Sequence, residues 1–181
     1  MGEGVLYRKV LGATFDALPP RIRELHASQI ERRWNGRAQV RRGDGVLAKI
    51  IGALAGLPRA ADNVAVTVVF TPEQGGEKWT RDFGGKIFIS EQSCDESKNQ
   101  CLLKERLGMV SIFFELVGDD KQLFFIPRRW SLLGLPMPKA LLPGGKSFEA
   151  EEHGQFCFNI EIRAPLAGLI VAYKGWLAQS T

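Results

Sequence analysis

The arrangement best suited to bind a ligand is an arginine between two aromatic residues on one face of a predicted strand. In the run 79–86 (WTRDFGGK), strand alternation puts Trp79, Arg81 and Phe83 on the same face. If that face points inward, Arg81 needs a partner, because an unpaired buried charge is very costly. Two alternatives stay open. Arg81 holds the acidic head group of a ligand while the aromatic rings line an apolar slot, or it pairs with a glutamate on a neighbouring strand.

A second basic and aromatic cluster ends a predicted strand over residues 123–130. Arg128, Arg129 and Trp130 are consecutive there. Both clusters combine a cation with aromatic surface, as a site for an amphipathic molecule would. The sequence therefore predicts one ligand site, made of Trp79, Arg81, Phe83, Arg128, Arg129 and Trp130.

The segment 132–143 (LLGLPMPKALLP) is apolar and contains three prolines, so it can form neither a regular strand nor a long helix. Folded inward, it would be a lid over the open end of a sheet, formed by Leu133, Leu135 and Met137. Exposed, it would be an apolar patch that contacts a protein or the periphery of a membrane. We expect the lid and keep an interaction module as an alternative.

No motif identifies a reaction or a catalytic residue. The two histidines, His26 and His153, have no nucleophile nearby in sequence, and a G-x-S-x-G motif is missing. The glycines of the run 79–86 fit a hairpin, because the spacing of a phosphate-binding loop is missing. Three glutamates within 149–152 fit a solvated strand edge. An enzyme that acts through a pocket carboxylate or a histidine is therefore the second hypothesis.

The three cysteines predict neither a metal site nor a cofactor, because their spacing is not that of a zinc site. Cys94 and Cys101 flank a polar turn and can face each other across a hairpin, but we expect reduced thiols. The N-terminus lacks the plan of a signal peptide. No apolar run approaches the roughly 18 residues of a membrane-spanning helix. A cytoplasmic protein is expected.

The net charge of +4 is unevenly distributed. Residues 1–59 contain eleven Lys and Arg against five Asp and Glu, whereas the rest of the chain has a small acidic excess. A basic region can attract nucleic acid, anionic lipid or an acidic partner. We expect an ordinary solvated face and no nucleic-acid partner.

The predicted secondary structure changes near residue 61 from mainly helices to mainly strands. Within a single domain, 1–181, a basic and helix-rich part (1–60) precedes a strand–turn–strand series (61–177). An apolar stripe predicts a helix over 46–55 that covers the sheet. Strand 155–163 alternates cleanly between apolar and polar residues, as a half-buried antiparallel strand does.

The series contains about eight to ten strands with short links and no βαβ crossover. The predicted fold is α+β: a strongly curved antiparallel sheet, a half-barrel of helix-grip-like or lipocalin-like form, with the N-terminal helices packed on it. Such a sheet can enclose a cavity. The leading functional hypothesis is non-catalytic binding of an apolar or amphipathic, lipid-like small molecule.

Several motifs together resemble a bacterial family of unknown function; they are 6–12 (LYRKVLG), 18–20 (LPP), 79–86 (WTRDFGGK), 129–130 (RW) with 133–138 (LGLPMP), and 173–177 (YKGWL). Members of that family occur alone or fused behind saccharopine-dehydrogenase-like Rossmann domains. The resemblance implies a self-contained bacterial domain, with fusion to or association with a Rossmann-type oxidoreductase. It implies no activity and no catalytic residue.

Overall fold

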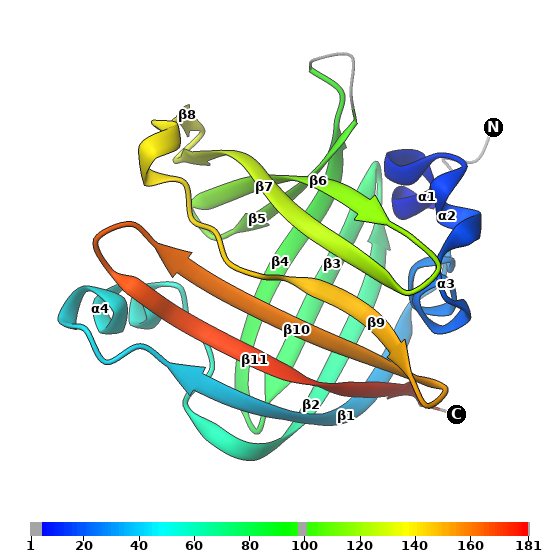
Figure 1. The fold of residues 1–181 in the computed structure, drawn as a ribbon, viewed down its shortest axis with the longest axis horizontal. Coiled ribbons are helices and arrows are strands. Elements are labelled where there is room, and N and C mark those ends of the chain that lie inside the picture. Colours follow the sequence, from blue (N-terminus) through cyan, green and yellow to red (C-terminus); the bar gives the residue numbers. More distant parts are fainter. Residues whose placement is uncertain (1–4, 98–100, 181) are drawn as a thin grey trace.

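Ten antiparallel strands form a closed barrel in the computed structural model, which describes residues 5–97 and 101–180 (Figure 1). The strands pair in the order β6-β5-β4-β3-β2-β1-β11-β10-β9-β7, and β7 pairs again with β6. A short additional strand, β8, pairs only with the end of β7. The strands are β1 (Arg32–Arg42), β2 (Ala61–Glu73), β3 (Gly76–Phe83), β4 (Lys86–Asp95), β5 (Leu102–Leu107), β6 (Val110–Gly118), β7 (Gln122–Leu132), β8 (Leu135–Pro136), β9 (Phe148–Glu152), β10 (Gln155–Ala164) and β11 (Gly168–Gln179).

The closure of the barrel corrects the predicted half-barrel. The curved antiparallel sheet is confirmed, but β6 and β7 pair along Val110–Gly118, and β7 also pairs with β9. Closure leaves the ten-stranded sheet without a terminal strand, whereas β8 keeps one unpaired side among the described residues. The sequence shows which residues form strands, but it does not show that β11 pairs with β1 or that β7 pairs with β9.

The seam between β7 and β9 is short. Only Gln122–Phe124 of β7 pairs with β9, followed by a hydrogen bond of 3.0 Å from the Phe125 amide to the Ser147 carbonyl. The chain before β9 then follows β10 instead, where Gly144 and Arg163 exchange backbone hydrogen bonds of 2.8 and 2.6 Å. Residues 133–147 therefore complete the barrel wall at the end away from the N-terminal helices.

Three short helices cover one end of the barrel (Figure 1). They are α1 (Leu6–Leu11), α2 (Thr14–Ala17) and α3 (Pro20–His26), and Pro20 occupies the first turn of α3, where its missing N–H costs nothing. Tyr7, Phe15, Leu18 and Ile22 are fully or almost fully buried. Their burial fixes the three helices as a cap at one end of the barrel, whereas we expected the N-terminal helices on the sheet.

Helix α4 (Val46–Leu54) lies at the opposite end, beside β11 (Figure 1). It does not cover the sheet with its apolar stripe as predicted. Its buried residues are Ala48 and Gly52. A Cβ atom at Gly52 would lie 1.7 Å from a guanidinium nitrogen of Arg42, so the small face packs on the barrel. The large apolar side chains of Val46, Leu47, Ile50 and Leu54 are left exposed, whereas Ile51 is half-buried.

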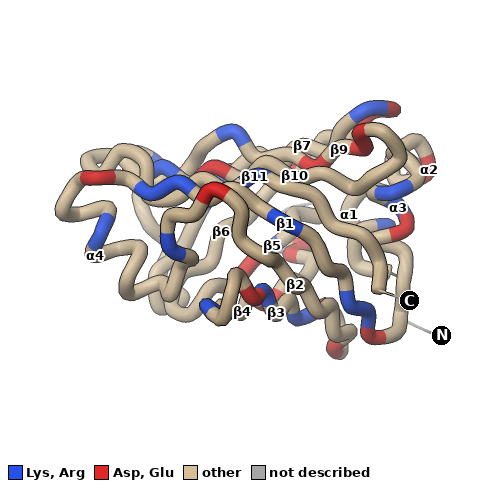
Figure 2. Tube along the Cα trace, turned by 90° about the horizontal axis from the view of Figure 1, so that it is seen from below, with Lys and Arg blue, Asp and Glu red and all other residues tan. Residues whose placement is uncertain are grey.

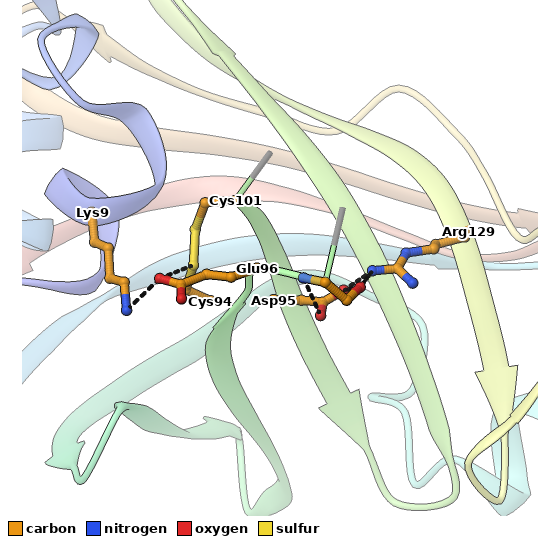
Figure 3. The surroundings of a disulfide bond; sticks show 7 residues. Lys9, Cys94, Asp95, Glu96, Cys101 and Arg129 are labelled. Atoms are coloured by element: carbon orange, nitrogen blue, oxygen red, sulfur yellow. Dashed lines mark hydrogen bonds and ion pairs between the residues drawn. A yellow bond between two sulfur atoms is a disulfide. The ribbon is translucent and has the colours of Figure 1, made fainter. Parts of the chain in front are cut away.

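Cys94 and Cys101 form a disulfide bond, whereas we expected reduced thiols (Figure 3). Their Cα atoms are 5.8 Å apart, within the usual range of a disulfide. The pairing follows from the fold, because the two cysteines lie on opposite sides of the connection between the adjacent strands β4 and β5. None of the helices in the described part of the chain has the length and apolar character needed to span a bilayer.

Candidate functional site

An apolar cavity of about 470 Å³ lies inside the barrel. Cavities of this size hold small organic molecules. Its wall is formed mainly by aromatic and branched aliphatic side chains from eight of the described strands; examples are Val68, Phe83, Phe88, Leu107, Phe114, Phe125, Ile160 and Ile170. The predicted alternation of β10 is confirmed, because Phe156, Phe158, Ile160 and Ile162 line this wall.

The cavity has an apolar mouth and a polar closed end. At the mouth, α4 and the segment after it contribute Ile51 and Leu57, and the chain between β8 and β9 contributes Leu141 and Pro143. At the end that α1–α3 cover, the wall contains Leu25, Trp79, Gln92 and Glu149. A ligand with one polar end therefore finds its hydrogen-bonding partners deep in the barrel.

Arg81 points into the barrel from β3 and is already paired. It donates hydrogen bonds to Ser90 Oγ on β4 at 2.7 Å and to Glu105 Oε1 on β5 at 3.0 Å. Ser90 Oγ also donates to Glu105 Oε1 at 2.6 Å. The guanidinium carbon lies 4.6 Å from the ring centroid of Trp79 and 5.3 Å from that of Phe88. The charge of Arg81 is thus balanced by a glutamate, as in the second of the two alternatives, but this glutamate lies on β5, one strand beyond the neighbouring β4.

His26 and Glu149 form a buried pair at the closed end. His26 Nε2 lies 2.7 Å from Glu149 Oε2, and the two side chains are 0% and 5% exposed. The ring of His26 stacks on that of Tyr7 with centroids 3.5 Å apart. The Tyr7 hydroxyl donates to Gln92 Oε1 at 2.9 Å. Because Glu149 and Gln92 line the cavity, the cap and the cavity wall share one polar network.

A buried ion pair between Arg32 and Glu77 lies beside this network. Arg32 Nη2 is 3.3 Å from Glu77 Oε2, and the guanidinium carbon of Arg32 lies 5.2 Å from the ring centroid of Phe70. Burial raises the pKa of Glu77, although His26 and Arg32 act in the opposite direction. Burial also lowers the pKa of Arg32. The site therefore holds Glu77 in a strongly desolvated position.

Tyr173 adds a phenol to the cavity wall. Burial raises its pKa to about 12, so the hydroxyl is uncharged at neutral pH. Its ring contacts those of Phe83 and Phe158 at centroid distances of 5.3 and 6.1 Å. A neutral hydroxyl among aromatic rings can donate a hydrogen bond to a ligand within the apolar part of the cavity.

The predicted site is only partly brought together, because a β-bulge redirects the second cluster. Arg128 is the extra residue of the bulge in β7, since Phe113 pairs with Arg129 and Phe114 pairs with Pro127. Trp130 lines the cavity together with Trp79, Arg81 and Phe83, whereas Arg128 and Arg129 do not appear in its wall.

Both of these arginines have partners away from the cavity. Arg128 Nε donates to Glu115 Oε2 at 2.6 Å. Arg129 forms an ion pair with Asp95 near the disulfide (Figure 3), and its guanidinium carbon lies 4.2 Å from the ring centroid of Phe113. Strand periodicity alone could not reveal the bulge, which turns Arg129 outward and Trp130 inward.

The predicted lid residues do not fold into the cavity. Leu133 and Leu135 are exposed and Met137 is half-buried. The same segment instead contributes Leu141 and Pro143 to the mouth. A tight turn between β7 and β8 places Leu133 and Leu135 on the outside of the barrel. The short helix η1 (Lys139–Leu141) follows this turn.

Sequence reasoning missed several polar residues in or beside the cavity wall, among them Glu77, Glu105, Glu149 and His26. Strand alternation puts Glu77 on the same face as Trp79 and Arg81, so the sequence pattern could have predicted that Glu77 points inward. Glu105 and Glu149 could not be distinguished from solvated strand residues, and His26 was one of two histidines with no nucleophile nearby in sequence. Each of these three becomes buried or cavity-lining only through contacts with distant parts of the chain.

A family model described as a domain of unknown function, DUF4166, matches residues 18–177. The matched range includes α3, α4 and nearly all of the barrel. No curated protein and no solved structure matches the chain.

Proposed function

The chain belongs to the DUF4166 family of domains of unknown function, and we propose that it binds an apolar or amphipathic, lipid-like small molecule inside its barrel. The observation that carries the proposal is the apolar cavity of about 470 Å³ with a mouth at one end. Burying the apolar part of a ligand against this wall removes its surface from water and supplies most of the binding free energy.

The polar groups of the wall favour a ligand whose polar end is uncharged. Arg81 is balanced by Glu105 through direct and serine-bridged hydrogen bonds, and Glu149 is bonded to His26. An added carboxylate would have to displace an existing partner of Arg81. Gln92 and Tyr173 offer neutral hydrogen-bonding groups, as an alcohol, an amide or a ketone would require.

Native mass spectrometry of freshly purified protein, followed by organic extraction, tests the proposal. We expect a stoichiometric lipophilic adduct, or binding of an added apolar fluorophore such as N-phenylnaphthylamine with a 1:1 stoichiometry. The lack of both would overturn the proposal.

Two matched variants locate the binding. Ile160→Trp places a large ring in the cavity, whereas Lys174→Trp places the same ring on the exposed side of β11, one residue away in the β10–β11 register. We expect the first variant to lower fluorophore affinity by at least about tenfold, since it removes room for the ligand, and the second to leave affinity unchanged. Equal affinities would place the ligand elsewhere.

The buried His26–Glu149 pair favours an enzyme as the second candidate function. Glu149 is the member of the pair that lines the cavity, and a desolvated carboxylate beside a histidine can accept and return a proton. In this case, His26→Gln and Glu149→Gln would retain ligand while conversion of the extracted molecule stops. The mass of the ligand before and after incubation with each protein separates binding from turnover.

The remaining expectations stay predictions. They are the bacterial origin, the fusion to or association with a Rossmann-type oxidoreductase, the cytoplasmic location, and the binding roles of Trp79, Arg81, Phe83 and Trp130.

A further inference from the structure

Four segments of the chain meet around the mouth of the cavity and form what we call the mouth rim: residues 46–59, 108–109, 133–146 and 165–167. Backbone hydrogen bonds connect them. The Leu133 amide donates to the Met109 carbonyl at 2.8 Å, and the Gly144 amide donates to the Arg163 carbonyl, just before the last segment, at 2.8 Å. Helix α4 lies beside the turn between β10 and β11 (Figure 1). The rim is therefore one continuous surface at the end opposite to α1–α3.

The rim exposes large apolar side chains from every one of its segments. Val46 and Leu54 of α4 are 75% and 80% exposed, Met109 is 60% exposed, Leu133 is 70% exposed and Leu166 is 91% exposed. Leucines scattered singly over a surface need no explanation, but a ring of them around a cavity mouth marks an interaction site. This ring is continuous with the apolar lining, because Ile51, Leu57 and Leu141 belong to the same segments.

The charges of the rim have one sign. Its four segments contain Lys49, Arg59, Lys139 and Lys146, and no aspartate or glutamate. Asp44, just before α4, is the nearest acidic residue in sequence to that helix.

The opposite end of the barrel carries charges of both signs (Figure 2). Asp16 on α2 and Glu24 on α3 form ion pairs with Arg8 and Arg21, and the turn after β6 places Asp119 and Asp120 beside Lys121. The rim therefore differs from the helical end, because its exposed apolar side chains lie beside basic residues and no acidic ones.

We propose that the mouth rim docks on the surface of an anionic lipid bilayer, from which the ligand enters the barrel; the second clause rests on the proposed function. Exposed leucines insert at the level of the head groups, while lysines and arginines beside them contact lipid phosphates. A second copy of the chain fits this surface less well, because two basic rims would repel each other.

Flotation with vesicles tests the docking. The full chain is mixed with vesicles of phosphatidylcholine alone or with about 30% phosphatidylglycerol. We expect flotation with the anionic vesicles, weakened by high salt, and much less with the neutral ones. Leu133→Ser combined with Leu166→Ser should weaken binding by at least about tenfold, since each leucine loses most of its insertion free energy. Ile30→Ser, which removes an equally exposed apolar residue far from the rim, should have no effect.

The outcomes separate docking from cavity binding. A rim variant that no longer floats but binds N-phenylnaphthylamine normally supports docking through the rim. A wild-type protein that does not float with anionic vesicles overturns the docking proposal, whatever its affinity for the fluorophore. A dimer in analytical ultracentrifugation that the rim variant dissociates also overturns it, because the rim would then be an interface between two copies.

Discussion

The imidazole Nε2 of His26 lies 2.7 Å from the carboxylate Oε2 of Glu149, deep at the junction of α3 and β9. The two residues are 123 positions apart in the chain. This contact fixes the helical cap to the barrel and places a carboxylate on the cavity wall with a histidine behind it. One buried pair therefore serves the fold and shapes the polar end of the site.

Removing the side chain of His26 should lower the free energy of unfolding more than replacing the Glu149 carboxylate with an amide. We expect His26→Ala to lower the free energy of unfolding by about 3–5 kcal/mol, because it leaves Glu149 buried without its partner. Glu149→Gln keeps a hydrogen-bonding group and should cost about 1–2 kcal/mol. Urea unfolding at neutral pH measures both values. His153→Ala, at an exposed turn, is the control and should change little. Equal costs for His26→Ala and His153→Ala would contradict this account.

The desolvated Glu77 should make stability fall as the pH rises above the ordinary pKa of a glutamate. Burial raises the pKa of Glu77 in the folded protein. The folded state then binds more protons than the unfolded state in the interval between the two pKa values, so deprotonation favours unfolding there. The stabilisation is complete below the unfolded pKa and is lost as the pH passes the folded pKa.

Urea unfolding of the wild type and of Glu77→Gln across the mildly acidic range measures this dependence. The wild type should lose stability relative to the variant as the pH rises from about 4 to 7. A difference that stays constant, or that changes in favour of the wild type, would rule out the raised pKa. Because the variant also leaves Arg32 without its carboxylate, only the change with pH is diagnostic, not the offset between the two curves.

Strand periodicity predicted the parts of this molecule that depend on neighbouring residues. The inward face of β10 and the shared face of Trp79, Arg81 and Phe83 followed from alternation and are present in the structure. The curved sheet also followed from local patterns, whereas the N-terminal helices were expected on the sheet and three of them cap one end of the barrel. Closure did not follow from local patterns, because it depends on the pairing of β7 with both β6 and β9.

The errors at the site have two physical causes. A one-residue bulge at Arg128 reverses the facing of all later residues of β7, which puts Arg129 outside and Trp130 inside. The polar partners of the site come from strands that are distant in sequence, as Glu105 does for Arg81. Composition could not show which of the chain's many glutamates would be buried.

The outward position of Arg129 predicts that it is dispensable for ligand binding. Arg129→Ala removes an ion pair with Asp95 and a contact with Phe113, both away from the cavity. We expect a change in the free energy of unfolding of no more than about 1 kcal/mol, since the pair is partly exposed, and an unchanged fluorophore affinity. Fluorescence titration and urea unfolding measure both. A tenfold loss of fluorophore affinity in a folded Arg129→Ala variant would show that Arg129 contributes to ligand binding.

The balance between Arg81 and Glu105 predicts a gain of anion binding when Glu105 is neutralised. In Glu105→Gln, Arg81 keeps its hydrogen bond to Ser90 but loses its counter-charge, so its guanidinium becomes available to a ligand carboxylate. We expect the affinity for dodecanoate to rise by on the order of tenfold relative to that for dodecanol. Glu115→Gln, which removes a carboxylate bonded to Arg128 instead, is the matched control and should leave the ratio unchanged. Adding Arg81→Met to Glu105→Gln should abolish the gain. If dodecanoate and dodecanol respond equally to Glu105→Gln, Arg81 does not face the polar end of the ligand.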